Sequence, residues 1–263
     1  MNEYGVGRLH GEITTANDNG GIGQETGPSR VGMDGIGQET GPNGAVIRSS
    51  FSPEAIRDAL HQPLPGLPAM VRMAPIPRPL EPPTPDHRPR EGAVLVLLYP
   101  NGPGDELHLV LTRRTESVGN HRGQISFPGG SVDPDDLSTA HTALREACEE
   151  IGVCEDNLQL LGDLTPLYIP PSDFRIYPHV AWLSRQPSFH PQPDEVAELL
   201  EVPISHFLDE RNITSEDWRL GDELRAVPYY NVCGHKVWGA TAMVLAEFAA
   251  VVESISYARQ TLR

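Results

Sequence analysis

Basic side chains, cysteines and long apolar stretches are all scarce in this sequence, and each shortage narrows the functions open to it. The 263 residues carry 20 Lys and Arg against 36 Asp and Glu, which gives a formal net charge of −16. Non-specific binding of nucleic acid needs a basic surface. The composition therefore argues against a nucleic-acid partner.

The few cysteines and the lack of a long apolar run bear on location. Cys148, Cys154 and Cys233 form no Cys-x-x-Cys pair and no disulfide framework, which favours a reducing compartment. No run of about 18 apolar residues occurs, so we predict no membrane span. Residues 1–4 show neither the basic region nor the apolar core of a signal peptide. We therefore expect a cytoplasmic protein.

Glycine and proline are abundant, with 25 and 26 copies, and they concentrate in the first third of the chain. Residues 1–50 contain a short duplication, in which Gly21–Pro28 recurs as Gly35–Pro42. Two polar, Gly-rich copies are too few for a solenoid, so we predict a disordered tail. Residues 51–90 are predicted to hold a short helix capped by Ser52 and a Pro-rich linker on the surface.

The folded domain is expected over residues 91–258. Apolar runs predict buried strands, a helical period predicts a closing helix, and the mixture indicates an α/β fold. The expected elements are strands at Ala93–Tyr99, Leu107–Thr112, Leu158–Leu164 and Arg175–Leu183, and a helix at Ala240–Tyr257. Arg113 and Arg114 end the second strand, and alternation sends their side chains to opposite faces, so only one can reach a cleft.

The stretch Leu144–Val153, most of which is predicted to be helical, carries the most informative side chains. At helical spacing Glu146, Glu149 and Glu150 lie on one side, and apolar residues lie on the other. Like charges four residues apart weaken a helix unless a cation neutralises them, and hard divalent cations prefer carboxylate oxygens. A solvated polar face is the alternative interpretation of the same pattern. Gly152 is expected to end the helix in the left-handed conformation.

This helix and the glycines before it resemble a known motif. Residues from Gly130 to Val153 are similar to the Nudix box, and Arg145–Val153 fits every specified position. The first half departs, since Asp136 stands where the box has Glu and Arg145 comes one residue late. A second stretch, Val110–Thr115 followed by Gly123–Gly130, resembles the signature of the coenzyme A pyrophosphatase subgroup, as does Val237–Ala242 later in the chain.

The resemblance implies a fold, a cofactor and a set of residue roles. The fold would be an α/β/α sandwich around a mixed, curved sheet. The implied cofactor is Mg²⁺ or Mn²⁺, with Glu146 and Glu150 as ligands and Glu149 as a nearby ligand or the base that positions water. Arg145 would orient the glutamates, while the backbone of Gly129 and Gly130 would contact the metal or the substrate. Which glutamate acts as general base stays open.

The implied substrate is coenzyme A or an acyl-coenzyme A, cleaved at its pyrophosphate. Arg114 would bind the phosphates. The signature's second arginine falls on Gly119, so either His121 or Arg122 could replace it, and Arg is the better phosphate ligand at neutral pH. Glu195 is the first choice for a further carboxylate.

Two other functions stay open. One is hydrolysis of another nucleoside diphosphate compound, such as ADP-ribose or NADH, and the other is a catalytically silent Nudix-fold binding module. A homodimer is included among the expectations because the family often dimerises.

Overall fold

A computed structural model provides the fold. It describes these parts of the chain: residues 28–32, 51–75, 80–102, 106–115, 123–154, 157–220 and 222–261, with side chains to 256. Most of the tail predicted over residues 1–50 therefore lies outside the described residues.

Within the described residues the strands form a nine-stranded mixed sheet and a separate three-stranded sheet. The main sheet has the order β1-β9-β3-β2-β8-β6, with β4, β5 and β7 pairing to β3, β2 and β8. Its strands are β1 (Ser29–Gly32), β2 (Arg90–Asn101), β3 (Glu106–Arg114), β4 (Ile125–Ser126), β5 (Gly129–Ser131), β6 (Gln159–Asp163), β7 (Leu167–Ile169), β8 (Phe174–Trp182) and β9 (Val196–Pro203). The small sheet holds β10 (Ile213–Leu220), β11 (Glu223–Val232) and β12 (His235–Trp238).

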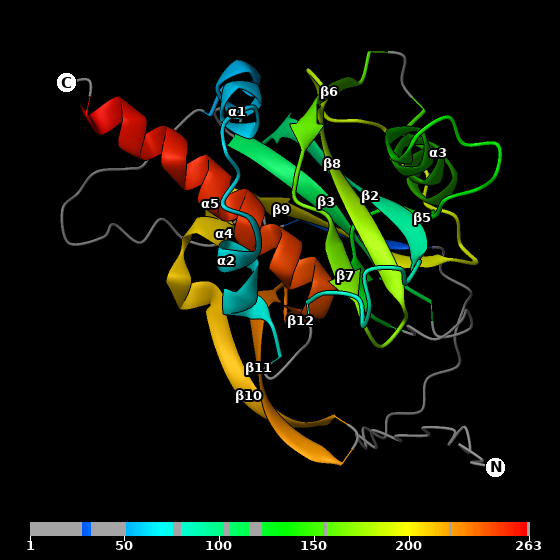
Figure 1. Cartoon of the computed structure of the whole chain (residues 1–263). Coiled ribbons are helices and arrows are strands. Elements are labelled where there is room, and N and C mark those ends of the chain that lie inside the picture. The colour runs from blue at the N-terminus through cyan, green and yellow to red at the C-terminus, as the bar shows by residue number, and fades with distance from the viewer. Residues whose placement is uncertain are drawn as a thin grey trace, which may run out of the picture.

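Helices cover both faces of the main sheet, which makes the molecule the α/β/α sandwich that the sequence predicts (Figure 1). Helix α3 (Thr139–Ile151) packs on one face. On the other lie α1 (Pro53–Leu60), α2 (Gly66–Met70), the 3₁₀ turn η1 (Val71–Met73) and α5 (Gly239–Thr261). Helix α4 (Ser205–Leu208) and the 3₁₀ turn η2 (Glu210–Asn212) lead into the small sheet.

The central strand β2 shows why the apolar run Ala93–Tyr99 is continuous. Leu95 and Leu97 point into the core under α3, while Val96 and Leu98 point into the core under α5. A strand covered on both faces needs apolar residues at every position. The predicted strands and the hairpin of β2 with β3 are confirmed.

Helix α3 follows its local signals closely. Ser138 caps its start by accepting a hydrogen bond from the amide of His141, and Gly152 ends it with a φ of 73°. Ala143, Ala147 and Ile151 are fully buried against the sheet. The predicted helix and its glycine cap are confirmed; Glu149 is left exposed on the outer side, whereas Glu150 is buried.

One expectation for the N-terminal third is wrong. The Pro-rich linker contains α2 and η1, whose Met70 and Met73 are buried against α5, because this stretch carries apolar side chains as well as prolines. Within the predicted tail, Ser29–Gly32 form β1, which pairs with β9 at the edge of the main sheet. The predicted helix after Ser52 is confirmed, since its hydroxyl accepts a hydrogen bond from the amide of Ala55.

The cysteine expectation is also wrong, because Cys148 and Cys154 form a disulfide bond across the end of α3. Two cysteines six residues apart become neighbours when Gly152 turns the chain back on the helix. The scarcity of cysteine therefore no longer supports a reducing compartment.

Helix α5 is more apolar than we expected from a sequence without a long apolar run. Among the described helices, α5 alone is long and apolar enough to cross a bilayer, with a mean hydropathy of 1.4 over Gly239–Ser256. However, 61% of that window is buried inside the fold. The closing helix predicted over Ala240–Tyr257 is confirmed and packs in the core, with Val244, Leu245 and Phe248 among its fully buried residues.

Candidate active site

The glutamates of α3 meet the backbone of β5, which is paired with β2. A Cβ on Gly130 would lie 2.4 Å from the Glu146 carboxylate, so only glycine lets that carboxylate rest on the strand. Gly129 has a φ of 156°, and its Cβ would lie 2.3 Å from the Ala93 carbonyl oxygen. The two glycines are therefore needed for different contacts, one with α3 and one with β2.

Glu150 is the buried member of the glutamate group, with 4% of its surface exposed. Its carboxylate accepts hydrogen bonds from the Gly129 amide at 3.2 Å and from Arg114 Nη1 at 3.4 Å. Burial above all, together with the nearby charges of Glu146 and Glu195, raises the pKa of Glu150 to about 7, against the opposing effects of the Gly129 amide and Arg114. A bound cation would offset the repulsion between these crowded carboxylates.

Arg145 holds the group together from the outer side. Its Nε and Nη2 each donate to Asp136 at 3.0 Å, and its Nη1 donates to Glu146 and Glu149, also at 3.0 Å. These bonds keep the pKa of Asp136 well below its usual range. Burial raises the pKa of Glu146, and the Arg145 contact opposes that rise. Arg145 thus fixes the carboxylates through charge-assisted hydrogen bonds, with Asp136 as its main anchor.

Glu195 lies beside the glutamates although it comes from a distant part of the chain. It directly precedes β9, and its carbonyl oxygen accepts a hydrogen bond from the Thr115 amide. Its charge raises the pKa of both Glu146 and Glu150. The structure thus brings it close to the box residues, and its role in catalysis stays a prediction.

The two arginines at the end of β3 diverge as alternation predicts. Arg114 turns toward α3 and contacts Glu150, while Arg113 donates to Glu198 on β9 at 2.7 Å. His235 of β12 lies 3.2 Å from the same Glu198 carboxylate. Sequence reasoning missed Glu198 and His235, because no local pattern reveals which strands become neighbours.

Three residues of the sequence analysis cannot be placed. Gly119, His121 and Arg122 lie outside the described residues. The late motif does have a structural role, because the Thr241 hydroxyl at the start of α5 donates to the Ile125 carbonyl oxygen at 3.0 Å. That bond ties α5 to β4, just before the glycines of the site.

The donor set fits a hard divalent cation, although the carboxylates are not arranged around one. Among the described residues, no three His, Cys, Asp or Glu side chains are placed to hold a metal ion. Arg145 draws Glu146 and Glu149 toward itself, and Glu150 turns to the Gly129 amide. Carboxylate oxygens are the ligands that Mg²⁺ and Mn²⁺ prefer. Glu146 and Glu150 therefore offer the type of donor that suits such an ion.

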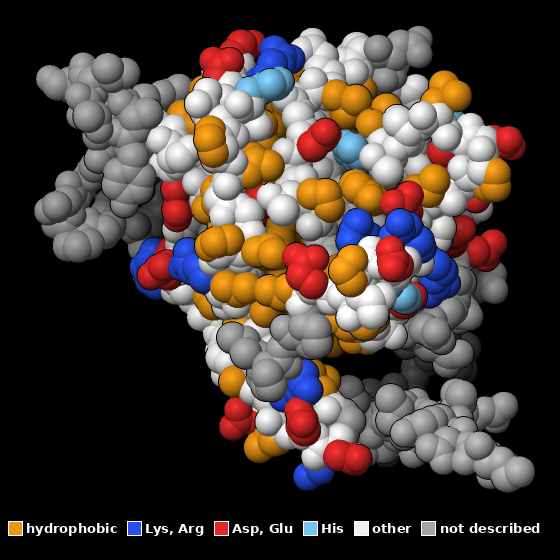
Figure 2. Space-filling model, in the orientation of Figure 1, with side chains coloured by type: hydrophobic (Ala, Val, Ile, Leu, Met, Phe, Trp, Pro, Cys, Tyr) orange, Lys and Arg blue, Asp and Glu red, His pale blue; other side chains and the backbone are white. Residues whose placement is uncertain are grey.

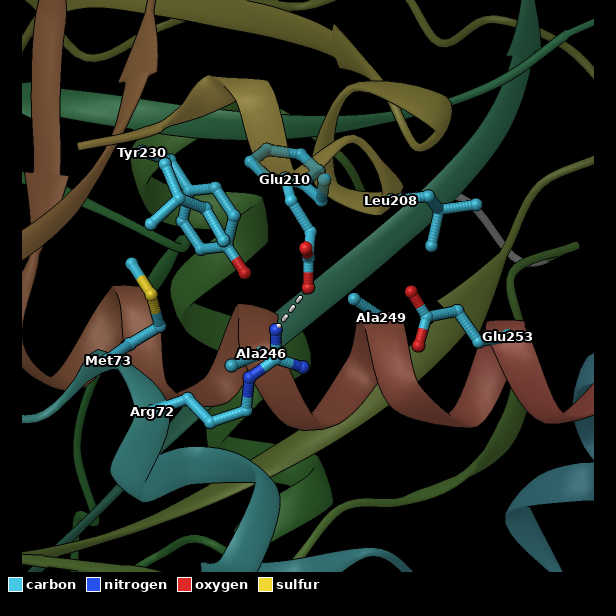
Figure 3. Close-up of a pocket in the computed structure, with 10 residues that line it drawn as sticks. Arg72, Met73, Leu208, Glu210, Tyr230, Ala246, Ala249 and Glu253 are labelled. Carbon is cyan, nitrogen blue, oxygen red and sulfur yellow. Dashed lines mark hydrogen bonds and ion pairs between the residues drawn. The ribbon is translucent and has the colours of Figure 1, made fainter.

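A separate small pocket lies between η1, α4, β11 and α5 (Figure 3). Arg72 and Glu210 form an ion pair there at 2.9 Å. None of the predicted site residues lines it. On the face shown in Figure 2, basic side chains form small separate groups among acidic ones. The absence of a nucleic-acid partner stays a prediction.

Comparisons with known proteins place the chain beside several similar proteins. The model of the NUDIX domain family matches residues 89–222. The Nudix hydrolase NudL of Pectobacterium atrosepticum is 38% identical over 63% of this chain and 84% of its own length. The mitochondrial coenzyme A diphosphatase NUDT8 of Homo sapiens is 36% identical over 62% of this chain and 69% of its own. A solved NUDIX hydrolase from Alicyclobacillus acidocaldarius aligns with 65% of this chain and 97% of its own, at 17% identity and a TM-score of 0.45.

Proposed function

The chain belongs to the Nudix family and is a Nudix pyrophosphohydrolase, and we propose that it cleaves the pyrophosphate of coenzyme A or its thioesters. The products would be 3′,5′-ADP and 4′-phosphopantetheine or its acylated form. The proposal rests on one observation: Glu146, Glu150 and Arg114 converge beside Gly129 and Gly130. The spacing of the second signature and the name of the human relative support the choice of substrate.

Nudix hydrolases generally use divalent metal ions, and we propose Mg²⁺ or Mn²⁺ here. The bound ion would neutralise phosphoryl charge and make a bound water more acidic. Glu146 and Glu150 would hold it, while Arg145 and Asp136 would keep Glu146 in place. The Gly130 backbone gives the Glu146 carboxylate room beside β5, because no Cβ stands between the strand and that side chain.

The remaining residues would handle the phosphates and the proton. Arg114 would donate hydrogen bonds to a phosphate oxygen while its Nη1 stays near Glu150. Glu149 is the most exposed of the three, at 60% of its side chain. It would accept a proton from the attacking water at the oxygen that Arg145 does not hold. One P–O bond forms to the water oxygen and one breaks in the pyrophosphate, in line.

Product analysis with the full-length protein tests the proposal. Coenzyme A, acetyl-coenzyme A, ADP-ribose and NADH would be offered side by side with Mg²⁺ or Mn²⁺. Glu150→Gln would serve as the inactive variant and Glu54→Gln, at an exposed position on α1, as the matched control. We expect 3′,5′-ADP from the coenzyme A compounds, abolished by Glu150→Gln alone.

Other outcomes would point to the alternatives. Faster turnover of ADP-ribose or NADH would favour a different Nudix substrate. No turnover, together with a melting temperature raised by coenzyme A, would favour the silent binding module. We also propose a cytoplasmic location and a homodimer, which fractionation and light scattering would test.

A further inference from the structure

The N-terminal strand β1 is held at the edge of the main sheet by very little apolar contact. It pairs in parallel with β9, with Ser29 opposite Glu198 and Gly32 opposite Glu201. Three of its four residues are exposed, and only Val31 packs against the core. Partial burial of one side chain stabilises the strand by less than ordering four residues costs. A further contact must select this segment.

That contact is made by Arg30 with Glu201. Glu201 is 3% exposed, and it accepts hydrogen bonds from Tyr99 at 3.0 Å and from Gln186 at 2.8 Å. Within the described residues, Arg30 is the one cation paired with it. The guanidinium also lies 5.1 Å from the centre of the Phe189 ring. A buried carboxylate without a cation is costly, so the site around Glu201 is suited to a guanidinium.

The duplicated tail offers two candidate strands, and only one carries this group. The repeated eight residues are followed by Ser29-Arg30-Val31-Gly32 in the first copy and by residues 43–46 in the second. Gly44 stands where the first copy has Arg30. The second copy lies outside the described residues, and its sequence lacks the side chain that Glu201 binds.

We propose that the β9 edge and Glu201 form a docking site for an extended peptide that carries arginine. The chain's own Ser29–Gly32 occupies the site, and Arg30 selects the first copy of the duplication over the second. Backbone pairing holds the strand and one side chain gives specificity, as in other cases of strand addition. Since β1 runs parallel to β9, its start lies toward the end of the sheet that carries Glu195.

Hydrogen exchange of the full-length protein tests the docking. Arg30→Ala would be compared with Arg88→Ala, since Arg88 is exposed and contacts only backbone carbonyls. We expect the amides of residues 29–32 to exchange about tenfold faster or more in Arg30→Ala, because a hydrogen bond to a charged group is lost. Exchange in Arg88→Ala should match the wild type.

Peptide binding to the same full-length variants tests the selectivity. A labelled peptide of residues 27–32 should bind to Arg30→Ala, whose site is vacated, and at least about tenfold more weakly to the wild type. A peptide of residues 41–46 should bind to neither. Because Arg30 lies in a segment outside the core, its replacement leaves the domain folded. Unchanged exchange in Arg30→Ala, equal binding of the two peptides, or no binding by either would overturn the proposal.

Discussion

Replacing Gly130 by alanine should abolish most of the activity while leaving the fold intact. The new Cβ would lie 2.4 Å from Cδ and Oε1 of Glu146, and ordinary contact begins at 3.4 Å. The carboxylate must therefore move by about 1 Å. It can do so, because it is the end of a flexible side chain and Gly130 does not need a positive φ. A misplacement of that size in a catalytic group lowers the rate by about 10²-fold.

Gly129 provides the matched control, since the same change one residue earlier meets backbone instead. Its Cβ would lie 2.3 Å from the Ala93 carbonyl oxygen and 2.7 Å from Val94 Cα, and the φ of 156° adds strain. These atoms belong to the paired strand β2 and cannot move without breaking the ladder. We expect Gly129→Ala to cost about 3 kcal/mol of stability, or roughly 6–12 °C in melting temperature.

Two measurements separate these outcomes: the initial rate of coenzyme A hydrolysis with Mg²⁺ and the melting temperature without substrate. Gly130→Ala should melt within about 2–4 °C of the wild type, with kcat down about 10²-fold. A Gly130→Ala enzyme with full kcat would show that the position of Glu146 against β5 does not matter for catalysis. A large loss of melting temperature in that variant would refute the argument that the side chain yields.

Three further predictions follow from the same region. Because the pKa of Glu150 is raised in the folded protein, the contribution of this residue to folding stability is fully present below about pH 4.5. That contribution is lost as the pH rises through about 7. Metal-free Glu150→Gln should therefore be more stable than the wild type at pH 8, by up to about 3 kcal/mol, and should differ little from it at pH 4. Denaturant melts at both pH values check this. An equal gain in stability at both pH values would contradict it. The lowered pKa of Asp136 has the opposite sign, so its contribution is present above about pH 4 and is lost in stronger acid. Asp136→Asn should thus be less stable than the wild type at pH 7, and the gap should narrow in melts toward pH 3; a constant gap would argue against the Arg145 pairing. Reduction of the Cys148–Cys154 bond should cost about 2 kcal/mol for so short a loop. Melts with and without reductant should show this loss in the wild type and in Cys233→Ser, and a Cys154→Ser variant that still responds to reductant would oppose it.

Much of the site was predictable because its signals are local. The cap at Ser138, the helical spacing of Glu146 and Glu150, and the turn at Gly152 all lie within fifteen residues. Each of these features depends on the backbone conformation of residues that are close in the sequence. The buried strand Ala93–Tyr99 was predictable for a similar reason, since a continuous run of apolar side chains indicates a strand that is covered on both faces.

Contacts between distant segments were decided only by the tertiary structure. Glu195 reaches the glutamates because β9 inserts between β1 and β3, a choice of neighbours that no local pattern encodes. The same pairing places Glu198 beside Arg113 and makes Glu201 available to Arg30. The sequence by itself determined the glutamate-bearing helix α3 and the strand types. The packing of the sheet decided which charges meet, because burial and pairing energies depend on partners far apart in the chain.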